Sequence, residues 1–321
     1  MQDFTILMPN PMPQSVVDGL SSHRLIKLWE HENREAVLQA EAGVVKGIAV
    51  GGHLQVDATY MSRFPALELV ANLGVGYDSI DAVWAGQHGI TVTNTPDVLN
   101  DEVADTALGL IIATVRQLPA AERYVRAGKW RDAPFPLTPT LRGRTVGIFG
   151  LGRIGKAIAT RAESFGLNVV YHGRSPQAGV PYLYFPTLVG LAQACDILVV
   201  IAPGGPATRG VVNAEVLKAL GPDGVLINVA RGTVVDEKAL IQALENGTIL
   251  AAGLDVFEDE PHVPEALLAM DHVVLLPHVG SASIHTRAAM AQLVVDNLRS
   301  WAEGRGPVTP VAETPWPHRT S

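Results

Sequence analysis

Cysteine is the scarcest residue of this 321-residue sequence, in which Cys195 is the only one. A single cysteine excludes an intramolecular disulfide and any metal site built from several thiolates. Cys195 stands in LAQACDILVV, beside an apolar run typical of a buried strand. We therefore expect a small core residue there rather than a reactive thiol, and we predict no metal site.

Basic residues are also in deficit, since 24 Lys and Arg stand against 32 Asp and Glu and give a formal net charge of −8. This balance argues against nucleic acid or an anionic membrane as a partner, because both select a basic surface. No apolar run approaches the roughly 20 residues that span a bilayer. The first residues, MQDFTILMPNPMPQ, lack the basic start and apolar stretch of a signal peptide, so we expect a cytoplasmic protein.

Apolar residues are plentiful, at 47%, over a length typical of about two domains. Strand and helix patterns alternate through the first hundred residues and again from Thr145 to about His278. Such alternation predicts an α/β fold with two doubly wound parallel sheets. Ligands bind beyond the carboxyl ends of the strands in such sheets. The candidate contact loops are therefore Gly51-Gly52, Asn72 to Gly76 and Asn94 to Pro96.

Two long helices and the tail bear on how the domains connect. Asn100 to Gln117 is predicted to be a helix leading from one domain to the other, and its apolar face suits either a central core helix or a subunit interface. A last helix near Ser283 to Glu303 is expected to return to the first domain. The tail from Pro307 onward is rich in proline, so we expect it to be loosely ordered.

The most informative motif is TVGIFGLGRIG, in which a predicted buried strand is followed by Gly150-Leu151-Gly152-Arg153-Ile154-Gly155 and then by a helical pattern from Lys156 to Phe165. In a G-x-G-x-x-G turn the first glycine makes the tight turn and the second admits a pyrophosphate. The third lets the helix pack closely on the strand. The helix N-terminus then directs its N–H groups at the anion. The motif predicts dinucleotide binding, with Arg153 as a clamp on a phosphate.

The residues after the next strand indicate which dinucleotide binds. NAD-binding versions of the motif carry an acidic residue about 20 positions on, which holds the ribose hydroxyls. Here the strand ends in Val170-Tyr171-His172-Gly173-Arg174-Ser175, with glycine where the acid would stand. Arg174 and Ser175 suit a 2′-phosphate, so we predict NADP(H). The alternative is that Arg174 is an ordinary exposed residue.

Three further strands end in residues that suit reduction of a 2-keto acid. Arg231 offers a planar fork for a carboxylate and a carbonyl. His278 titrates in the range needed for a proton donor, and Glu260 beside it would favour the charged imidazole. Each has an ordinary alternative, such as a surface ion pair or an acidic turn, but together behind a dinucleotide motif they indicate a catalytic site.

The sequence resembles the D-isomer-specific 2-hydroxyacid dehydrogenases in several segments. VNVARGTVVDEKAL, AGLDVFEDEP and LLPHVGSAS look like the three signature segments of that family, and ANLGVGYDSID and TNTPDVLNDEVADTALGL match its N-terminal segments. RAGKW, HGRS and DVFEDEPHVPE look most like the NADPH-dependent glyoxylate/hydroxypyruvate and hydroxyphenylpyruvate reductases. The likeness implies a flavodoxin-like substrate domain of residues 1–98 and 287–321, with a Rossmann-type dinucleotide-binding domain of residues 99–286 inserted.

The resemblance also implies roles for single residues. Arg231 would orient the substrate, His278 would be the acid/base with Glu260 as its partner, and the Val75 and Gly76 amides would receive the substrate carboxylate. The cofactor contacts implied are Leu151 to Ile154 at the pyrophosphate, Asp255 near the nicotinamide, and Ala202, Pro203 and Thr208 on the adenine side, together with Val229, Ala230, His278 and Gly280. The likeness further implies a homodimer built on the 100–117 helix and the loop after it, from which Trp130 or Phe135 would reach the partner's site.

We therefore expect an oxidoreductase that reduces small 2-keto acids, such as glyoxylate, hydroxypyruvate or hydroxyphenylpyruvate, to D-2-hydroxy acids. A 2-ketogluconate or phosphoglycerate-type dehydrogenase of the same family is a second interpretation. A non-catalytic NAD(P)-sensing protein is a third, disfavoured because Arg231, Glu260 and His278 are all present. The substrate pocket is expected to involve Gly51 to Leu54, Leu99 and the Trp130–Phe135 loop.

Overall fold

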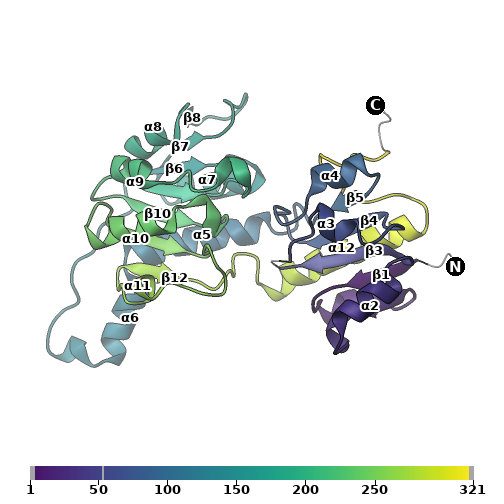
Figure 1. The fold of residues 1–321 in the computed structure, drawn as a ribbon. Helices are drawn as coiled ribbons and strands as arrows, with labels where there is room; N and C mark the ends of the chain where they lie inside the picture. Colours follow the sequence, from purple (N-terminus) through teal and green to yellow (C-terminus); the bar gives the residue numbers. More distant parts are fainter. Residues whose placement is uncertain (1–3, 53, 318–321) are drawn as a thin grey trace. The chain divides into compact units, whose positions relative to one another are not determined.

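The computed structural model describes residues 4–52 and 54–317 of the chain. The chain separates into two compact units, Met1–Leu99 with Ile284–Ser321 and Asn100–Ser283. Each unit is a parallel sheet with helices packed on it (Figure 1). His53, within the 51–54 segment expected to shape the pocket, lies outside the described residues.

The first unit contains a five-stranded parallel sheet in the order β2-β1-β3-β4-β5. Its strands are β1 (Thr5–Met8), β2 (Arg24–Lys27), β3 (Val45–Gly51), β4 (Leu69–Leu73) and β5 (Thr91–Thr93). Its helices are α1 (Gln14–Gly19), the 3₁₀ turn η1 (Leu28–Glu30), α2 (Arg34–Glu41), α3 (Ala58–Met61), α4 (Ala82–Gln87) and α12 (Ile284–Ala302). The order reverses between β1 and β3, which is where ligands bind in such sheets.

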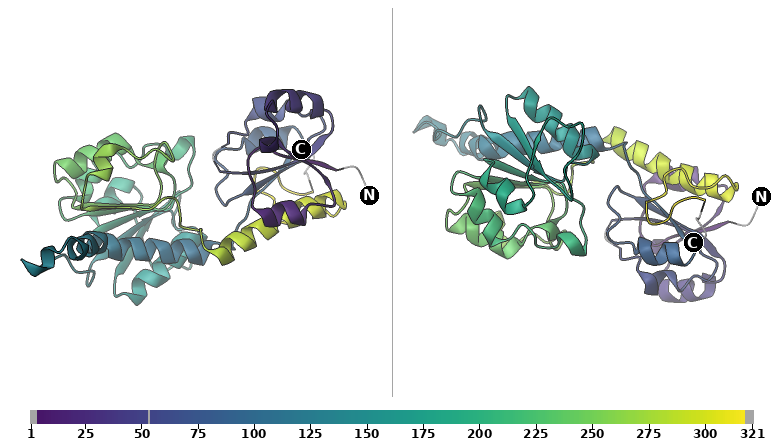
Figure 2. Two further views of the ribbon diagram at one scale, coloured as in Figure 1. Left: turned by 90° about the horizontal axis from the view of Figure 1, so that it is seen from below. Right: turned by 90° about the horizontal axis from the view of Figure 1, so that it is seen from above.

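Alternating side chains of the first sheet fill two separate cores. Leu7 and Ile48 belong to a cluster with residues of α2, α3 and α4. Ile6 and Met8 point to the other face, where they join a cluster with residues of α1 and α12. Figure 2 shows α12 lying beside α1. The last helix thus belongs to the first unit, as the sequence predicts.

The second unit contains a seven-stranded parallel sheet in the order β12-β11-β10-β9-β6-β7-β8. Its strands are β6 (Thr145–Phe149), β7 (Asn168–His172), β8 (Leu183–Tyr184), β9 (Ile197–Val200), β10 (Val225–Asn228), β11 (Ala251–Leu254) and β12 (Val273–Leu275). Its helices are α5 (Asn100–Val115), α6 (Leu118–Arg126), η2 (Lys129–Arg131), α7 (Arg153–Ser164), α8 (Leu188–Gln193), η3 (Pro206–Thr208), α9 (Ala214–Leu220), η4 (Gly232–Val234), α10 (Glu237–Glu245) and α11 (Glu265–Leu268). The order reverses at β6 and β9, so the predicted doubly wound fold is confirmed in both units.

The long helix α5 is a core helix of the second unit. It packs against α7 and across β10 and β11 (Figure 2). A Cβ atom on Gly253 of β11 would lie 2.8 Å from Leu110 Cγ of α5, so the glycine permits a close approach of helix to sheet. Arg161 of α7 pairs with Asp101 at 2.9 Å and Asp105 at 2.5 Å on α5. The structure thus shows the core role of this helix, and a role in a subunit interface stays a prediction.

Two sequence expectations need correction. The helix after the glycine motif begins at Arg153, inside the motif, rather than at Lys156. The tail is ordered as far as it is described: Val311 and Thr314 are buried. Thr314 Oγ1 accepts a hydrogen bond from the Val92 N–H at 2.9 Å. Proline content did not predict this because the order comes from contacts with β5, far away in the sequence.

Candidate functional site

The glycine motif forms a tight turn between β6 and α7. Gly150 has a positive φ of 106°, and a Cβ atom there would lie 2.7 Å from the backbone nitrogen of Ala202. A Cβ on Gly155 would lie 2.2 Å from Gly150 O. Both positions therefore exclude side chains, for the reasons that the motif predicts.

The second glycine of the motif faces open space instead. A Cβ on Gly152 would meet no atom within 4 Å. Gly152 is the N-cap of α7, and no side chain caps its first N–H groups. Uncapped N–H groups and the helix dipole together suit an anion such as a pyrophosphate. The turn lies where β6 and β9 meet, at the point where the strand order reverses, so the residues fit a dinucleotide.

The segment after β7 carries the groups predicted to distinguish NADP from NAD. Gly173 has no atom within 4 Å of an added Cβ, while Arg174 and Ser175 are exposed. Gln177 donates from Nε2 to Leu151 O at 2.7 Å. This contact joins the segment to the glycine turn.

Aromatic rings support the start of the same segment. The His172 ring stacks on Phe149, with centroids 5.5 Å apart, and its Nδ1 lies 2.8 Å from Phe185 O. Tyr184 donates to Gly173 O at 3.2 Å, and Tyr171 Oη accepts from the Gln177 N–H at 2.7 Å. These contacts hold the backbone on both sides of Arg174 and Ser175.

Three of the residues expected to contact the cofactor, Ala202, Val229 and Ala230, are buried. Thr208 lies in η3, and its hydroxyl donates to Pro203 O at 2.6 Å. The hydroxyl thus holds the 203–208 turn in its folded form.

Arg231 is positioned by a buried asparagine. Asn228 Nδ2 donates to Arg231 O at 3.0 Å, and Asn228 Oδ1 accepts from the Ala230 N–H at 3.1 Å. The half-buried Arg231 side chain donates from Nη1 to Ala230 O at 2.7 Å. A Cβ on Gly232 would lie 1.8 Å from Phe257 C, so the Arg231 loop packs directly against the loop after β11.

The loop after β11 brings Glu260 to His278. His278 Nδ1 lies 2.7 Å from Glu260 Oε2. The other carboxylate oxygen, Oε1, accepts from the Phe257 N–H at 3.0 Å. The Glu260 side chain is 12% exposed and that of His278 is 38% exposed. The carboxylate is thus fixed at both oxygens, and the imidazole remains accessible.

Asp255 holds the backbone that carries His278. Its Oδ1 accepts from the Val279 N–H at 2.7 Å and its Oδ2 from the Gly280 N–H at 2.8 Å, while its own O accepts from the His278 N–H at 2.8 Å. His278 has a positive φ of 53°, which requires such support. Burial raises the pKa of the Asp255 carboxyl, and the two N–H bonds oppose that rise. Asp255 is the residue expected near the nicotinamide, and both of its carboxylate oxygens accept hydrogen bonds from the protein backbone.

Val75 and Gly76 lie in the first unit, in the loop after β4. Both are half-buried. The carbonyl oxygens of this loop accept hydrogen bonds from Asn72 and Asn94. Sequence patterns place these asparagines at strand ends, but they do not reveal this contact. The contacts of Gln177 and Asn228 cannot be predicted from sequence patterns for the same reason.

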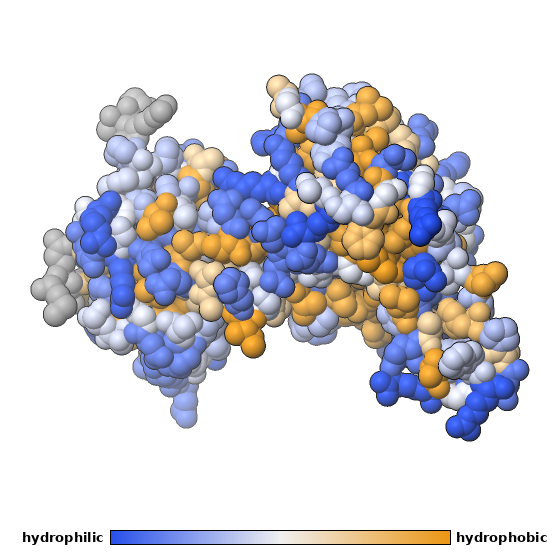
Figure 3. Space-filling view, turned by 180° about the vertical axis from the view of Figure 1, so that it is seen from behind, coloured by the Kyte–Doolittle hydropathy of each residue, from blue (hydrophilic) through white to orange (hydrophobic). Residues whose placement is uncertain are grey.

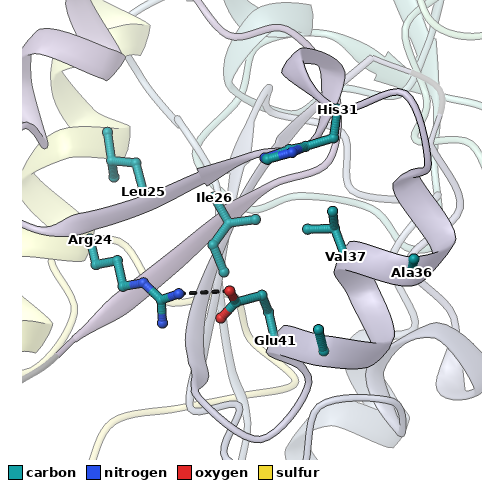
Figure 4. Close-up of a pocket in the computed structure, with 8 residues that line it drawn as sticks. Arg24, Leu25, Ile26, His31, Ala36, Val37 and Glu41 are labelled. Carbon is teal, nitrogen blue, oxygen red and sulfur yellow. Dashed lines mark hydrogen bonds and ion pairs between the residues drawn. The ribbon is translucent and has the colours of Figure 1, made fainter.

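A surface hollow of about 420 Å³ in the first unit is a poor candidate site (Figure 4). It lies between the start of β2 and α2, and thus away from the carboxyl ends of the strands. Its two ionic side chains, Arg24 and Glu41, pair with each other at 2.6 Å. The hollow therefore presents no unpaired charge to a ligand.

Within residues 4–52 and 54–317, no three His, Cys, Asp or Glu side chains are grouped to hold a metal ion. No helix in the same part of the chain is both long and apolar enough to cross a membrane.

The chain is similar to proteins of one known family. Residues 108–280, more than half of the chain, match the model of the D-isomer specific 2-hydroxyacid dehydrogenase NAD-binding domain. Glyoxylate/hydroxypyruvate reductase A of Arabidopsis thaliana is 46% identical, and hydroxyphenylpyruvate reductase of Plectranthus scutellarioides is 43% identical; both alignments cover 97% of this chain and 100% of the relative. The crystal structure of NADPH-dependent glyoxylate/hydroxypyruvate reductase from Sinorhizobium meliloti, in complex with NADP and malonate, is 53% identical with a TM-score of 0.91 over 98% of each chain.

Proposed function

Because the chain belongs to the D-isomer-specific 2-hydroxyacid dehydrogenase family, we propose that it reduces small 2-keto acids to D-2-hydroxy acids with NADPH. Glyoxylate and hydroxypyruvate are the proposed substrates, and hydroxyphenylpyruvate is a third. The names of the relatives in Arabidopsis thaliana, Plectranthus scutellarioides and Sinorhizobium meliloti support this substrate class.

The contact between His278 Nδ1 and Glu260 Oε2 at 2.7 Å is the observation that carries the proposal. A carboxylate can only accept a hydrogen bond, so it keeps a proton on Nδ1 and fixes the imidazole orientation. The protonated ring can then donate from Nε2 to a carbonyl oxygen. Both residues follow strands of the sheet that carries the glycine motif.

The reaction needs one hydride and one proton. NADPH, held at the glycine turn, would supply the hydride for the keto carbon, and the carbonyl oxygen would take up the proton. His278 gives its proton to that oxygen and leaves as the neutral imidazole. Arg231, held by Asn228, pairs with the substrate carboxylate and polarises the carbonyl. The Val75 and Gly76 amides bind the substrate carboxylate.

The segment after β7 supports NADPH over NADH. No carboxylate stands at Gly173 to hold ribose hydroxyls, and Arg174 and Ser175 are exposed where a 2′-phosphate would bind. Arg153 begins α7 and is proposed to clamp a phosphate. The similar reductase from Sinorhizobium meliloti is NADPH-dependent.

A substrate panel tests this function. NADPH oxidation is followed with glyoxylate, hydroxypyruvate, 4-hydroxyphenylpyruvate and 2-ketogluconate, using wild type, His278→Gln and His31→Gln. We expect turnover with at least one substrate and a loss of about 10²-fold or more in kcat for His278→Gln. His31 is exposed in the first unit, and its variant should match wild type. NADPH binding without turnover of any 2-keto acid would favour the sensing protein instead.

We also propose that the protein is a homodimer built on α5 and the loop after it. That loop contains α6 and the segment after α6, which together we call the arm (residues 118–144). No residue of α6 is buried, and the arm projects from its own unit (Figure 1). Four apolar side chains are exposed on it, and Figure 3 shows hydrophobic surface there. They are Leu118, Val125, Trp130 and Leu137.

Of the two aromatic residues predicted to reach a partner's site, the arm favours Trp130. Phe135 packs edge-on against Tyr124, with ring centroids 5.4 Å apart. Trp130 is 68% exposed. Light scattering should show a dimer for wild type and a smaller species for Val125→Asp, with Val83→Asp in the first unit as the control. A monomeric wild type would refute the dimer.

The proposed compartment is the cytoplasm. The single cysteine is buried and requires no oxidising environment. Fractionation of cells, with the protein detected by antibody, tests this placement.

A further inference from the structure

Asn72 sits inside the loop proposed to bind the substrate carboxylate. It stands in β4 and is 5% exposed. Its Nδ2 donates to Gly74 O at 3.1 Å and to Gly76 O at 2.9 Å. One buried side chain thus holds two carbonyl oxygens of the loop.

Asn94, in the loop after β5, holds the carbonyl between those two. Its Nδ2 donates to Val75 O at 2.9 Å. The tail in turn holds the Asn94 backbone, because Thr309 Oγ1 donates to Asn94 O at 2.6 Å and Asn297 Nδ2 donates to Thr309 Oγ1 at 2.9 Å. The asparagine is therefore fixed from behind by the C-terminal segment.

These contacts fix three consecutive peptide planes. In a trans peptide the C=O of one residue and the N–H of the next point in opposite directions. Since Gly74 O, Val75 O and Gly76 O all face asparagine amides, the N–H groups of the following residues face away from them. Those N–H groups belong to Val75, Gly76 and Tyr77. Among the described residues, none of the three donates to a protein acceptor.

We propose that Asn72 and Asn94 are positioning residues that direct a row of three N–H donors, those of Val75, Gly76 and Tyr77, at the substrate carboxylate. The inference rests on the proposed function, which supplies the carboxylate, and it adds Tyr77 N–H to the donors. Three preorganised N–H groups bind an anion without the cost of ordering a flexible loop. The side-chain amides never touch the substrate.

Asn94→Ala and Asn72→Ala remove the side-chain donors, and Thr314→Val is the matched control. Thr314 is buried in the same unit and anchors the tail to Val92 through two hydrogen bonds, without touching the loop. Asn72 is buried and its variant can fail to fold; Asn94 is half-buried, so its variant keeps the test decisive. Thermal melting is recorded for all three.

We expect both asparagine variants to raise the KM for glyoxylate by about tenfold, because the backbone N–H groups lose their fixed direction and their charge-assisted hydrogen bonds to the carboxylate weaken. The KM for NADPH should stay within about twofold of wild type, since its proposed site lies on residues of the other unit. Thr314→Val should lower the melting temperature with both KM values unchanged. An Asn94→Ala variant that lowers the melting temperature but leaves the KM for glyoxylate unchanged would show a merely structural role and overturn the inference.

Oxalate binding separates this inference from the proposed function. Oxalate carries two carboxylates and no ketone, so its Kd for the NADPH-bound protein, measured by calorimetry, reports carboxylate binding without turnover. A Kd raised by Asn94→Ala supports the inference even if wild type reduces no 2-keto acid. An unchanged Kd overturns it even if wild type is an active reductase.

Discussion

Glu260 Oε2 lies 2.7 Å from His278 Nδ1, while Glu260 Oε1 accepts the Phe257 N–H at 3.0 Å. The backbone bond fixes which carboxylate oxygen remains for the imidazole. A glutamine cannot reproduce this arrangement, because only one of its two terminal atoms is an acceptor.

Glu260→Gln should therefore lower the kcat of keto-acid reduction by about 10²-fold. If the glutamine oxygen keeps the Phe257 N–H, its NH₂ group faces Nδ1 as a donor, so the bond that orients the imidazole through an Nδ1 proton is lost. The measurement is kcat and KM for glyoxylate in wild type and in Glu260→Gln.

Glu258→Gln is the control for that prediction. Glu258 lies two residues away and pairs with Arg209 at 3.4 Å on the surface. It should behave as wild type, because exposed pairs contribute little. Equal kcat values for wild type and Glu260→Gln would show that the carboxylate does not orient the imidazole.

Gly173→Asp should reverse the cofactor preference. The added side chain meets no atom within 4 Å at its Cβ, so the fold tolerates it. Its carboxylate repels a 2′-phosphate and accepts hydrogen bonds from ribose hydroxyls. We expect kcat/KM for NADPH to fall by about tenfold or more and that for NADH to rise. Asn246→Asp adds the same charge at an exposed site and should change neither kcat/KM value. An unchanged ratio of kcat/KM for NADPH to that for NADH in Gly173→Asp would show that the 2′-phosphate binds elsewhere.

Gln177→Leu should weaken NADPH binding without slowing the chemical step. The variant keeps the side-chain bulk but loses the 2.7 Å bond from Nε2 to Leu151 O. The segment with Arg174 and Ser175 then loses its tie to the glycine turn. We expect the KM for NADPH to rise about threefold to tenfold, as loss of roughly one hydrogen bond implies, with kcat near wild type. Gln193→Leu, a substitution at an exposed position in the same unit, is the control. An equal KM for NADPH in the two variants would show that the bond from Gln177 to Leu151 does not support cofactor binding.

Much of the fold is predictable because its signals are local. The strand, glycine turn and helix around Gly150 follow from apolar runs and turn residues that stand next to each other in the sequence. The order of the tail does not, because Thr314 becomes buried only against β5. Apart from the 3₁₀ turns, α6, β8 and α11 are elements that the sequence patterns do not indicate; β8 and α11 are too short for periodicity to detect.

The candidate site is likewise predictable only in part. Residue type and strand-end position single out Arg231, Glu260 and His278 from the sequence, although their roles stay predictions. The supporting contacts depend on where separate loops meet in space. No sequence pattern shows that Asn72 faces Gly76 O or that Gln177 faces Leu151 O, because an asparagine or glutamine at a strand end has many partners available.

Cys195 offers a prediction on pH that does not involve the site. Burial raises the pKa of its thiol from 9.0 to about 12, so the folded protein keeps the thiol neutral at pH 8. A thiolate is the reactive form. We expect 5,5′-dithiobis(2-nitrobenzoate) to label Cys195 at pH 8 only after unfolding in urea.

The raised pKa of the Cys195 thiol also makes the free energy of unfolding depend on pH. The folded state binds the thiol proton more tightly than the unfolded state, so its stabilising contribution is complete below pH 9 and is lost as the pH rises from 9 toward 12. Urea titrations of wild type and Cys195→Ala at pH 8 and pH 10 measure this loss. Wild type should lose more unfolding free energy between the two pH values than the alanine variant, which has no thiol to ionise. Equal losses, or labelling of the native protein at the rate seen in urea, would mean that the thiol is exposed in solution and is not the buried core residue that fills the space above Gly147.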